Sequence, residues 1–308
     1  MNILITGGTG FIGSHLIKSL LKKKHRIILL KRSFSNTDRI KREIKKVKIY
    51  DIDKKNQMHS AFQDQKVDMI IHLAAHYVKY EKTIEDNEAM IQSNLLFPLK
   101  LLELAKINHV NYFINTGTCF EYQRKTTKIS EGDLIEPYNY YAVTKVMFEE
   151  SLKYYCARYG LKAVTLKLFY PYGEQDNMKL VTYVIKSLKD GSDLDLSLSE
   201  QKLDYVYIKD VIDAYTKTIH FIRSKKYKNY ISFNIGQGVG IRIKDFVQTA
   251  GNIAQSHVKI NFNQPYHENE IMHMVSNNRQ AQNILGWVAK TTVEEGLSKM
   301  LKIKHKQK

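Results

Sequence analysis

The N-terminal run MNILITGGTGFIG constrains the fold more than any other stretch of the chain. Its mainly apolar residues 2–6 lead through the glycines into residues 14–21, which carry apolar side chains at helical spacing. A strand, a glycine loop and an amphipathic helix in this order are typical of a dinucleotide site. Gly7 permits a tight turn, Gly10 lets the backbone approach a pyrophosphate, and Gly13 brings the helix close to the strand. A glycine-rich turn without a ligand, in a flavodoxin-like fold, is the alternative.

Short apolar runs of strand length recur along the chain. They lie at residues 26–30, 47–52, 69–75, 112–115, 163–169 and 232–235, and a helical pattern of leucines fills residues 87–106. This alternation predicts an α/β fold, a Rossmann-type doubly wound parallel sheet with its ligand crevice at the C-terminal ends of the strands. The strict alternation ends beyond Pro171, which predicts a smaller C-terminal substrate-binding lobe.

The same pattern predicts two domains that are intertwined in sequence. Residues 1–170 are expected to form the dinucleotide-binding Rossmann domain, with its sheet completed by about residues 231–236. Residues 171–308 are expected to form mainly the substrate-binding lobe. A chain of 308 residues is long enough to bury a full core.

The net charge of +17 has three explanations: nucleic-acid binding, an anionic small substrate, or a lysine-rich composition. No nucleic-acid-binding module is recognisable, so we expect no nucleic-acid partner, and the positive field would favour a phosphorylated substrate. The apolar runs are shorter than the roughly 18 residues that span a bilayer, so we expect no membrane partner and a cytoplasmic protein. Cys119 and Cys156 lack the spacing of metal ligands, and we expect reduced thiols and no metal.

The residues after the second apolar run bear on the choice of cofactor. NAD-binding folds place an acidic residue about 20 positions after the glycines, where it binds the adenosine ribose, whereas this chain has Lys31 and Arg32. Both cations attract a ribose 2′-phosphate, so NADP(H) is favoured over NAD(H). The alternative is that both side chains only face water. Asp51 and Ile52, at the end of the third run, are expected to flank the adenine.

A candidate catalytic set follows the run at residues 112–115. Thr118 ends the strand that this run begins, and Tyr141 and Lys145 open a predicted helix, on one face at a spacing of four residues. An ammonium beside a phenol lowers the pKa of the phenol from about 10, which a tyrosine needs to exchange protons near neutral pH. Thr118 would add a hydroxyl to the substrate oxygen. The tyrosine–lysine spacing is common by chance, and it gains weight from Thr118 and the glycine loop.

With these residues in hand, the chain resembles the extended short-chain dehydrogenase/reductases of the NAD-dependent epimerase/dehydratase family that act on nucleotide sugars. The resemblance runs over residues 2–301. It is carried by TGGTGFIG, His72-Leu73-Ala74-Ala75, Asn94, Thr118, Tyr141 with Lys145, Phe169-Tyr170-Pro171-Tyr172-Gly173, the run Asp204 to Val211, the run Phe233 to Gly238, and Leu285-Gly286-Trp287. It implies hydride transfer between a nicotinamide and a sugar carbon, usually C4, with Tyr141 as acid or base, and a homodimer.

The resemblance also assigns the residues that hold each ligand. The expected cofactor-binding residues are Gly7, Gly10, Phe11, Ile12, Gly13, Lys31, Arg32, Asp51, Ile52, Leu73, Ala74, Ala75, Tyr141, Lys145, Phe169 and Pro171. The expected substrate-binding residues are His76, Thr118, Cys119, Tyr170, Lys179, Lys202 and His267.

Three features sort the reactions of the family. Family 4,6-dehydratases carry Asp-Glu directly after the catalytic threonine, whereas this chain has Cys119 and Phe120, which argues against dehydration. The fucose-synthase type has a cysteine two residues before the strand-end tyrosine. In this chain the residue two before Tyr122 is Phe120, which argues against that type. Short matches at residues 94–102, 113–116, 199–201, 244–246 and 269–272 are similar to the CDP-abequose and CDP-paratose synthases.

The expected function is therefore NADPH-dependent reduction of the C4 keto group of a nucleotide-linked (di)deoxy sugar or heptose, CDP- or GDP-linked, in surface polysaccharide biosynthesis. An NAD-dependent C4 epimerase or C4 dehydrogenase is the alternative. A catalytically silent dinucleotide-binding regulatory protein is the alternative from another class.

Three positions depart from the family pattern. Tyr170 replaces an asparagine, while Leu203 and His267 replace arginines that commonly hold the nucleotide diphosphate in relatives. Losing bidentate guanidinium donors is not a neutral change. Either a cation among Lys179, Lys202, Arg242 and His267 compensates, or the nucleotide lies differently.

Overall fold

The computed structural model describes residues 1–78, 83–177, 179–224 and 229–302. Within them, seven strands form one sheet in the order β11-β6-β5-β4-β1-β2-β3. Their bounds are β1 Asn2–Thr6, β2 Arg26–Lys31, β3 Lys48–Asp51, β4 Met69–His72, β5 Tyr112–Thr118, β6 Lys162–Leu168 and β11 Tyr230–Ile235. Parallel pairing joins β1 to β2 and β4, β2 to β3, and β4 to β5. The predicted Rossmann-type parallel sheet is confirmed.

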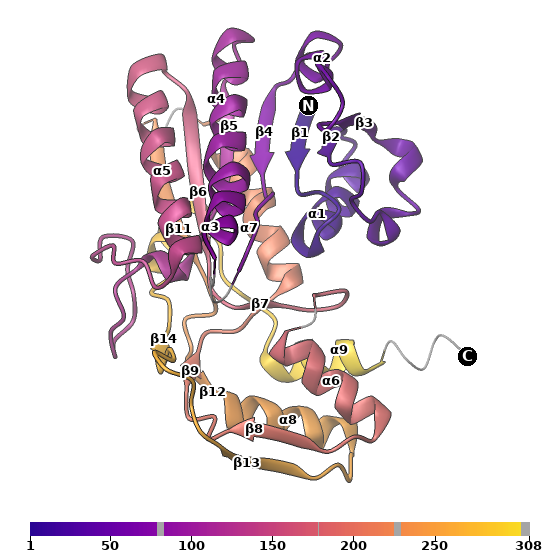
Figure 1. Ribbon diagram of the computed structural model, residues 1–308, viewed down its shortest axis with the longest axis vertical. Coiled ribbons are helices and arrows are strands. Elements are labelled where there is room, and N and C mark those ends of the chain that lie inside the picture. Colours follow the sequence, from indigo (N-terminus) through magenta and orange to yellow (C-terminus); the bar gives the residue numbers. More distant parts are fainter. Residues whose placement is uncertain (79–82, 178, 225–228, 303–308) are drawn as a thin grey trace. The chain divides into compact units, whose positions relative to one another are not determined.

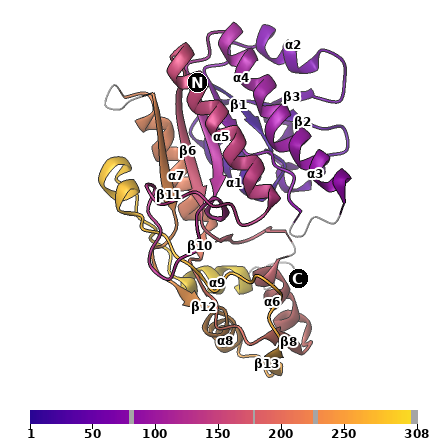
Figure 2. The ribbon, with the colours of Figure 1, turned by 60° about the vertical axis from the view of Figure 1, so that its left-hand side comes forward.

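Helices lie on both faces of this sheet (Figures 1 and 2). Their bounds are α1 Phe11–Lys22, α2 Gln57–Gln63, α3 Ile84–Ile91, α4 Phe97–Ile107, α5 Tyr140–Tyr159 and α7 Ile208–Phe221, with short 3-10 turns at Asp38–Ile40, Ile44–Lys46 and Cys119–Glu121. Side chains of α2, α4 and α5, among them Phe62, Leu101 and Phe148, share one buried cluster with even-numbered residues of β1 and β2. Alternation along these strands sends the odd-numbered residues to the opposite face, where α1 packs.

One helix differs from the sequence prediction. The single helix expected over residues 87–106 starts earlier, at Ile84, and is interrupted by a π-helical segment, Gln92–Leu96, before α4 begins. Pro98 stands in the first turn of α4, where its missing N–H cannot continue the hydrogen-bond ladder. The fifth strand, β5, ends at Thr118 as expected and carries the threonine to the C-terminal edge of the sheet.

The chain separates into two compact units. The first contains residues 1–123, 133–167 and 212–233, and the second contains residues 124–132, 168–211 and 234–308. The first unit holds most of the large sheet with the glycine loop, and the second holds small sheets and the remaining helices.

The second unit is built from short strands and three helices within the described residues. β7 Pro171–Tyr172 pairs with β10 Val206–Tyr207, β9 Lys202–Leu203 lies between β12 Ile241–Arg242 and β14 His273–Met274, and β8 Leu194–Ser197 pairs with β13 Ile260–Gln264. The helices are α6 Leu180–Asp190, α8 Ile243–Ala254 and α9 Val293–Lys302, with a π-helical turn at Ala281–Leu285. Trp287 is fully buried and donates its indole N–H to the Asp210 carbonyl at 2.9 Å, so it packs the core of this unit.

Across the residues that the structure describes, no helix is both long and apolar enough to cross a bilayer.

Candidate active site

The glycine loop lies between the end of β1 and the start of α1. Gly7 has a φ of +67°, and a Cβ there would lie 2.5 Å from the Ala74 nitrogen. A Cβ on Gly13 would lie 2.2 Å from the Gly7 carbonyl oxygen. Both glycines are therefore required by close backbone approach within the protein. Thr6 closes the arrangement, since its hydroxyl accepts from the Ala74 N–H at 3.2 Å.

Gly10 differs from its neighbours because the protein itself leaves room there. A Cβ on Gly10 would lie 3.2 Å from the Gly7 oxygen, a much longer approach than the 2.5 and 2.2 Å at Gly7 and Gly13. Gly10 precedes α1, whose start has no side-chain cap and no acidic residue in the first turn. The first N–H groups of a helix carry a partial positive charge, and a pyrophosphate satisfies them. The residues of this loop therefore fit a dinucleotide phosphate.

The predicted cofactor-binding residues of the first unit lie at the C-terminal ends of its strands. Phe11 and Ile12 begin α1, Lys31 ends β2, Asp51 ends β3, and Leu73 and Ala74 follow β4 directly. Because parallel strands bring these ends to one edge, the structure gathers them around the glycine loop. Arg32, Ile52 and Ala75 each stand one to three residues beyond a strand end at the same edge.

The loop after β2 is held by its own side chains. The Lys31 ammonium donates to the carbonyls of Arg32 and Ser33 at 2.8 and 3.3 Å. The Ser33 hydroxyl donates to Asp51 at 2.6 Å, which lowers the pKa of that carboxyl. The Arg32 guanidinium is exposed and lies over the Phe34 ring, 4.5 Å from its centroid. Lys31 therefore shapes the loop, and Arg32 is the cation better placed to meet a ribose phosphate.

Thr118, Tyr141 and Lys145 belong to the first unit, where α5 packs against β5 and against the turn Cys119–Glu121. Thr118 ends β5, is largely buried, and accepts from the Phe120 N–H at 3.3 Å. Helix α5 begins at Tyr140 because Asn139 caps it, accepting from the Ala142 N–H at 3.0 Å. The cap places Tyr141 in the first turn, and the buried Lys145 follows one turn later.

The electrostatics of this set differ from the sequence expectation. Burial raises the pKa of the partly buried Tyr141 phenol, and the charge of Glu121 raises it further, so the expected lowering by Lys145 is wrong for this environment. Burial also lowers the pKa of Lys145 to about 8, while Glu121 and Glu149 act in the opposite direction. The spacing of four residues predicted the pair but not its desolvation, which favours the uncharged form of both groups.

Sequence reasoning missed two residues around Tyr141. Tyr77 packs its ring edge against Tyr141, and Glu121 acts on it electrostatically from the turn after Thr118. Neither residue stands in a motif, so the sequence carried no signal for either.

The loop after β4 is tied to α5 by Asn94 of the π-helical segment. Its side chain accepts from the His76 N–H at 2.7 Å and donates to the His76 carbonyl at 2.9 Å and the Thr144 hydroxyl at 3.0 Å. His76 is thus fixed through its backbone, beside the turn that carries Tyr141. Cys119, the third predicted substrate residue of this unit after Thr118 and His76, is a buried thiol.

The remaining predicted site residues belong to the second unit. They are Phe169, Tyr170, Pro171, Lys179, Lys202 and His267. Phe169 is fully buried, and its N–H donates to the Ile235 carbonyl at 3.0 Å. Lys179 is exposed and lies 3.5 Å from the Asp176 carboxylate, and Lys202 and His267 are also exposed.

Arg242, one of the cations that could replace the arginines of the family pattern, is paired within its own unit. Arg242 donates to both oxygens of Asp245, at 2.8 and 2.9 Å, and to Glu200 at 3.1 Å. Its guanidinium is therefore neutralised within the unit. Leu203, at a position where the resemblance leads one to expect arginine, is buried.

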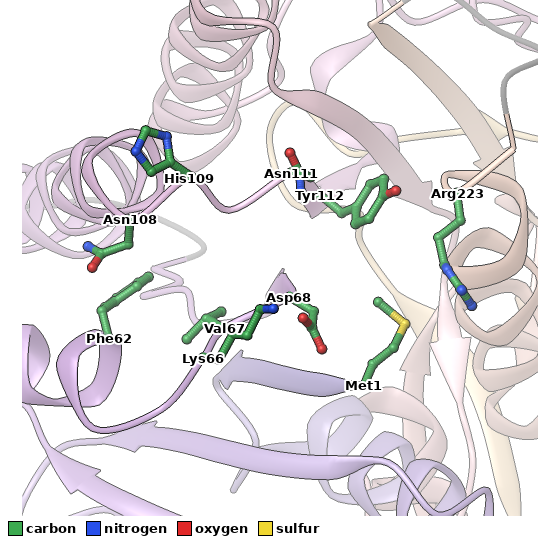
Figure 3. A pocket seen from close by; sticks show the side chains of 10 residues that line it. All are labelled: Met1, Phe62, Lys66, Val67, Asp68, Asn108, His109, Asn111, Tyr112 and Arg223. Atoms are coloured by element: carbon green, nitrogen blue, oxygen red, sulfur yellow. The ribbon is translucent and has the colours of Figure 1, made fainter.

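A cavity of about 430 Å³ lies at the other end of the large sheet (Figure 3). Met1, Asp68 and Tyr112, which line it, stand at or just before the N-terminal ends of β1, β4 and β5. The glycine loop and Thr118 stand at the C-terminal ends of the same sheet. The cavity is therefore separate from the candidate active site.

Comparisons with known proteins identify the family of the chain. The model of the NAD dependent epimerase/dehydratase family matches residues 3–236. The chain is 31% identical to CDP-abequose synthase of Salmonella muenchen, over 98% of this chain and 97% of that protein. It is 25% identical to dTDP-4-dehydro-6-deoxyglucose reductase of Escherichia coli, over 97% of this chain and 96% of that protein.

A solved structure extends the likeness to the whole fold. UDP-glucuronic acid 4-epimerase from Bacillus cereus, in complex with UDP-glucuronic acid and NAD, matches with a TM-score of 0.86 at 25% identity, over 98% of each chain. The resemblance inferred from the glycine loop and the tyrosine–lysine pair is confirmed. The chain is an enzyme that belongs to the NAD dependent epimerase/dehydratase family.

Proposed function

We propose that this protein catalyses the NADPH-dependent reduction of the C4 keto group of a nucleotide-linked deoxy sugar or heptose, in the biosynthesis of a surface polysaccharide. The observation that carries the proposal is the placement of Thr118, Tyr141 and Lys145 in one unit, around the end of β5 and the start of α5. Similarity to CDP-abequose synthase and to dTDP-4-dehydro-6-deoxyglucose reductase supports reduction. A CDP- or GDP-linked substrate and a cytoplasmic homodimer belong to the same proposal.

The reaction needs a proton donor and a hydride. A bound reduced nicotinamide supplies the hydride that the C4 carbon receives. Tyr141 gives its phenolic proton to the C4 oxygen, and Thr118 donates a hydrogen bond to that oxygen. The surroundings raise the pKa of Tyr141, so the phenol keeps its proton near neutral pH until the oxygen needs it. Lys145, with a pKa of about 8, is then mostly charged and stabilises the phenolate that remains.

The glycine loop and Arg32 account for the cofactor in this proposal. The N–H groups at the start of α1 would hold the pyrophosphate above Gly10, where the protein leaves room. Arg32 would pair with a ribose 2′-phosphate, as a guanidinium does bidentately.

One observation favours a second candidate, an NAD-dependent C4 epimerase. Asp51 and Asp53 bind Ser33 at 2.6 and 2.8 Å, so two carboxylates stand beside the loop that would meet the 2′-phosphate. Carboxylates at this place repel a phosphate and suit the free ribose hydroxyls of NAD. The similar epimerase structure that contains NAD points the same way.

The test offers the purified protein CDP-, GDP-, UDP- and dTDP-linked 4-keto-6-deoxy sugars with NADPH or NADH. We expect NADPH oxidation matched by a C4 hydroxyl product. Bound NAD(H) after purification, with C4 epimers formed and no net oxidation, would establish the second candidate instead.

The variant Tyr141→Phe should lose roughly 10²- to 10⁴-fold in kcat, the usual contribution of an acid catalyst, while NADPH still binds. Tyr140→Phe is the matched control, because consecutive helical residues face about 100° apart. Turnover retained by Tyr141→Phe would remove Tyr141 from the mechanism.

A further inference from the structure

Glu121 is a fully buried carboxylate that binds the backbone of Thr118. One of its oxygens accepts from the Thr118 N–H at 2.7 Å, and the other accepts from the Lys167 ammonium at 2.6 Å. Gly117 makes room for this arrangement. A Cβ there would lie 2.9 Å from the Glu121 oxygen that binds the Thr118 N–H, and 3.0 Å from the Lys167 Cγ. The carboxylate is therefore built into the end of β5.

The carboxylate belongs to a buried cluster of charges beside α5. Lys167 on β6 also lies 3.3 Å from Glu149, which stands one helical turn after Lys145. The titratable groups that act on Glu121 or respond to it, from every element packed around it, are Lys167, Glu149, Lys145, Tyr141 and Tyr230. Two carboxylates and two ammonium groups balance one another when all four are charged. Charges this deeply buried persist only when they are paired.

The negative charge of Glu121 acts on both candidate catalytic groups of α5. It raises the pKa of Tyr141, and it raises the pKa of Lys145 against the lowering caused by burial. Both groups must hold their protons at the start of a reduction. Without the Glu121 charge, Tyr141 and Lys145 would therefore lose their protons at lower pH.

We propose that Glu121 is a positioning residue for the reaction: it fixes Thr118 through the Thr118 N–H, and it places a buried carboxylate, joined through Lys167 to Glu149, against the helix that carries Tyr141 and Lys145. The inference rests on the proposed function, in which Thr118 and Tyr141 meet the C4 oxygen. The hydrogen bond and the charge are two separate contributions, and two variants distinguish them.

Glu121→Gln keeps an acceptor for the Thr118 N–H and loses the charge. We expect the alkaline limb of its kcat/KM profile to move down by about one pH unit, the low end of the effect of a nearby charge. Glu121→Asp keeps the charge, but its shorter side chain cannot reach both Thr118 and Lys167. We expect kcat to fall about tenfold, the cost of one misplaced group, with the alkaline limb unmoved. In both variants the KM for NADPH stays within about twofold of wild type, because neither contact touches the glycine loop.

Glu150→Gln is the matched control. Its carboxylate is exposed on α5, the helix that carries Tyr141 and Lys145, and pairs with Lys153 at 2.7 Å, so both the pH profile and kcat should match those of the wild type.

A second measurement needs no substrate. In protein labelled with [13Cε]lysine, Lys145 should titrate near 8, below the value of about 10.4 for a free lysine side chain. Its signal is identified by its absence from Lys145→Met. In Glu121→Gln this titration should move down by about one pH unit, and in Glu150→Gln it should not move.

The outcomes separate the two proposals. A Lys145 titration unmoved by Glu121→Gln would overturn the charge role, whether or not any sugar is reduced. A moved titration in a wild-type protein that reduces no 4-keto sugar would refute the proposed function and leave the charge relationship standing. If Glu121→Gln does not fold, Glu121→Asp decides, because an undiminished kcat there would overturn the positioning role.

Discussion

The ring of Tyr77 meets the ring of Tyr141 edge to face, with centroids 4.9 Å apart and planes at 88°. Tyr77 is 47% exposed. Aromatic pairs in this geometry contribute about 0.5–1.5 kcal/mol beyond their buried area. Tyr77 therefore restrains the orientation of the proposed acid.

Replacing Tyr77 tests this restraint. Tyr77→Ala should lower kcat for the 4-keto sugar roughly 2- to 10-fold, the fold-change that corresponds to the energy of such a pair. Tyr77→Phe keeps the ring edge and should retain the wild-type kcat. Steady-state kinetics of both variants decide the point. A loss of the same size in Tyr77→Phe would assign the effect to the Tyr77 hydroxyl and contradict the ring contact.

Gly10 offers a test of the dinucleotide site that spares the fold. A methyl group at Gly10 would meet the Gly7 carbonyl oxygen at 3.2 Å, and the φ of −74° suits alanine, so Gly10→Ala should lower the Tm far less than Gly13→Ala does. The same methyl group would stand where the pyrophosphate approaches the backbone. We expect the Kd for NADPH, measured by fluorescence titration, to rise at least about tenfold, or about 1.4 kcal/mol.

Gly132→Ala is the control for that experiment, since a Cβ there has no neighbour within 4 Å among the described residues. NADPH binding by Gly10→Ala at the wild-type Kd would place the pyrophosphate elsewhere. Gly13→Ala is less informative, because its Cβ would lie 2.2 Å from the Gly7 oxygen and would disturb the fold itself.

Arg32 should decide between the two cofactors. A charge-assisted hydrogen bond contributes about 1.5–3 kcal/mol, so Arg32→Ala should raise the KM for NADPH roughly 10- to 100-fold and leave the KM for NADH almost unchanged. Lys31→Ala should have a smaller effect, because the Lys31 ammonium already binds two carbonyls of its own loop.

Arg26→Ala, at the opposite end of β2, serves as the matched control for Arg32→Ala. Equal effects on the KM values for NADPH and NADH would mean that Arg32 meets a group common to both cofactors. NAD would then be the better candidate.

The parts of the fold and site that the sequence predicted are those encoded by neighbouring residues. The glycine loop, the apolar strands and the Tyr141–Lys145 spacing are local patterns, and the sheet and the family followed from them. The break before Pro98 was missed because the leucine pattern of residues 87–106 continues through it. Glu121 was missed because it is recognised as part of the site only through its hydrogen bond with Lys167, which lies 46 residues away in sequence. The direction of the Tyr141 pKa was wrong for the same reason, since desolvation comes from packing and not from spacing.

Glu121 should also leave a signature in the pH dependence of stability. Burial raises its pKa from 4.5 to about 7, so between these values the folded state holds a proton that the unfolded state has released. A raised pKa contributes stability that is fully present below the unfolded value and is lost as the pH rises through the folded value. The free energy of unfolding of the wild type should therefore lose this contribution between about pH 5 and pH 8.

Glu121→Gln cannot titrate and should lack that loss. We compare the free energy of unfolding of the variant with that of the wild type. The variant's value, minus that of the wild type, should be larger at pH 8 than at pH 5 by on the order of 3 kcal/mol at most. Urea denaturation of both proteins at the two pH values measures the difference, and Glu150→Gln, with its exposed carboxylate, should follow the wild type at both. A difference between Glu121→Gln and wild type that is the same at pH 5 and pH 8 would show that Glu121 is already charged throughout this range. In that case Lys167 stabilises the Glu121 carboxylate more strongly than burial destabilises it.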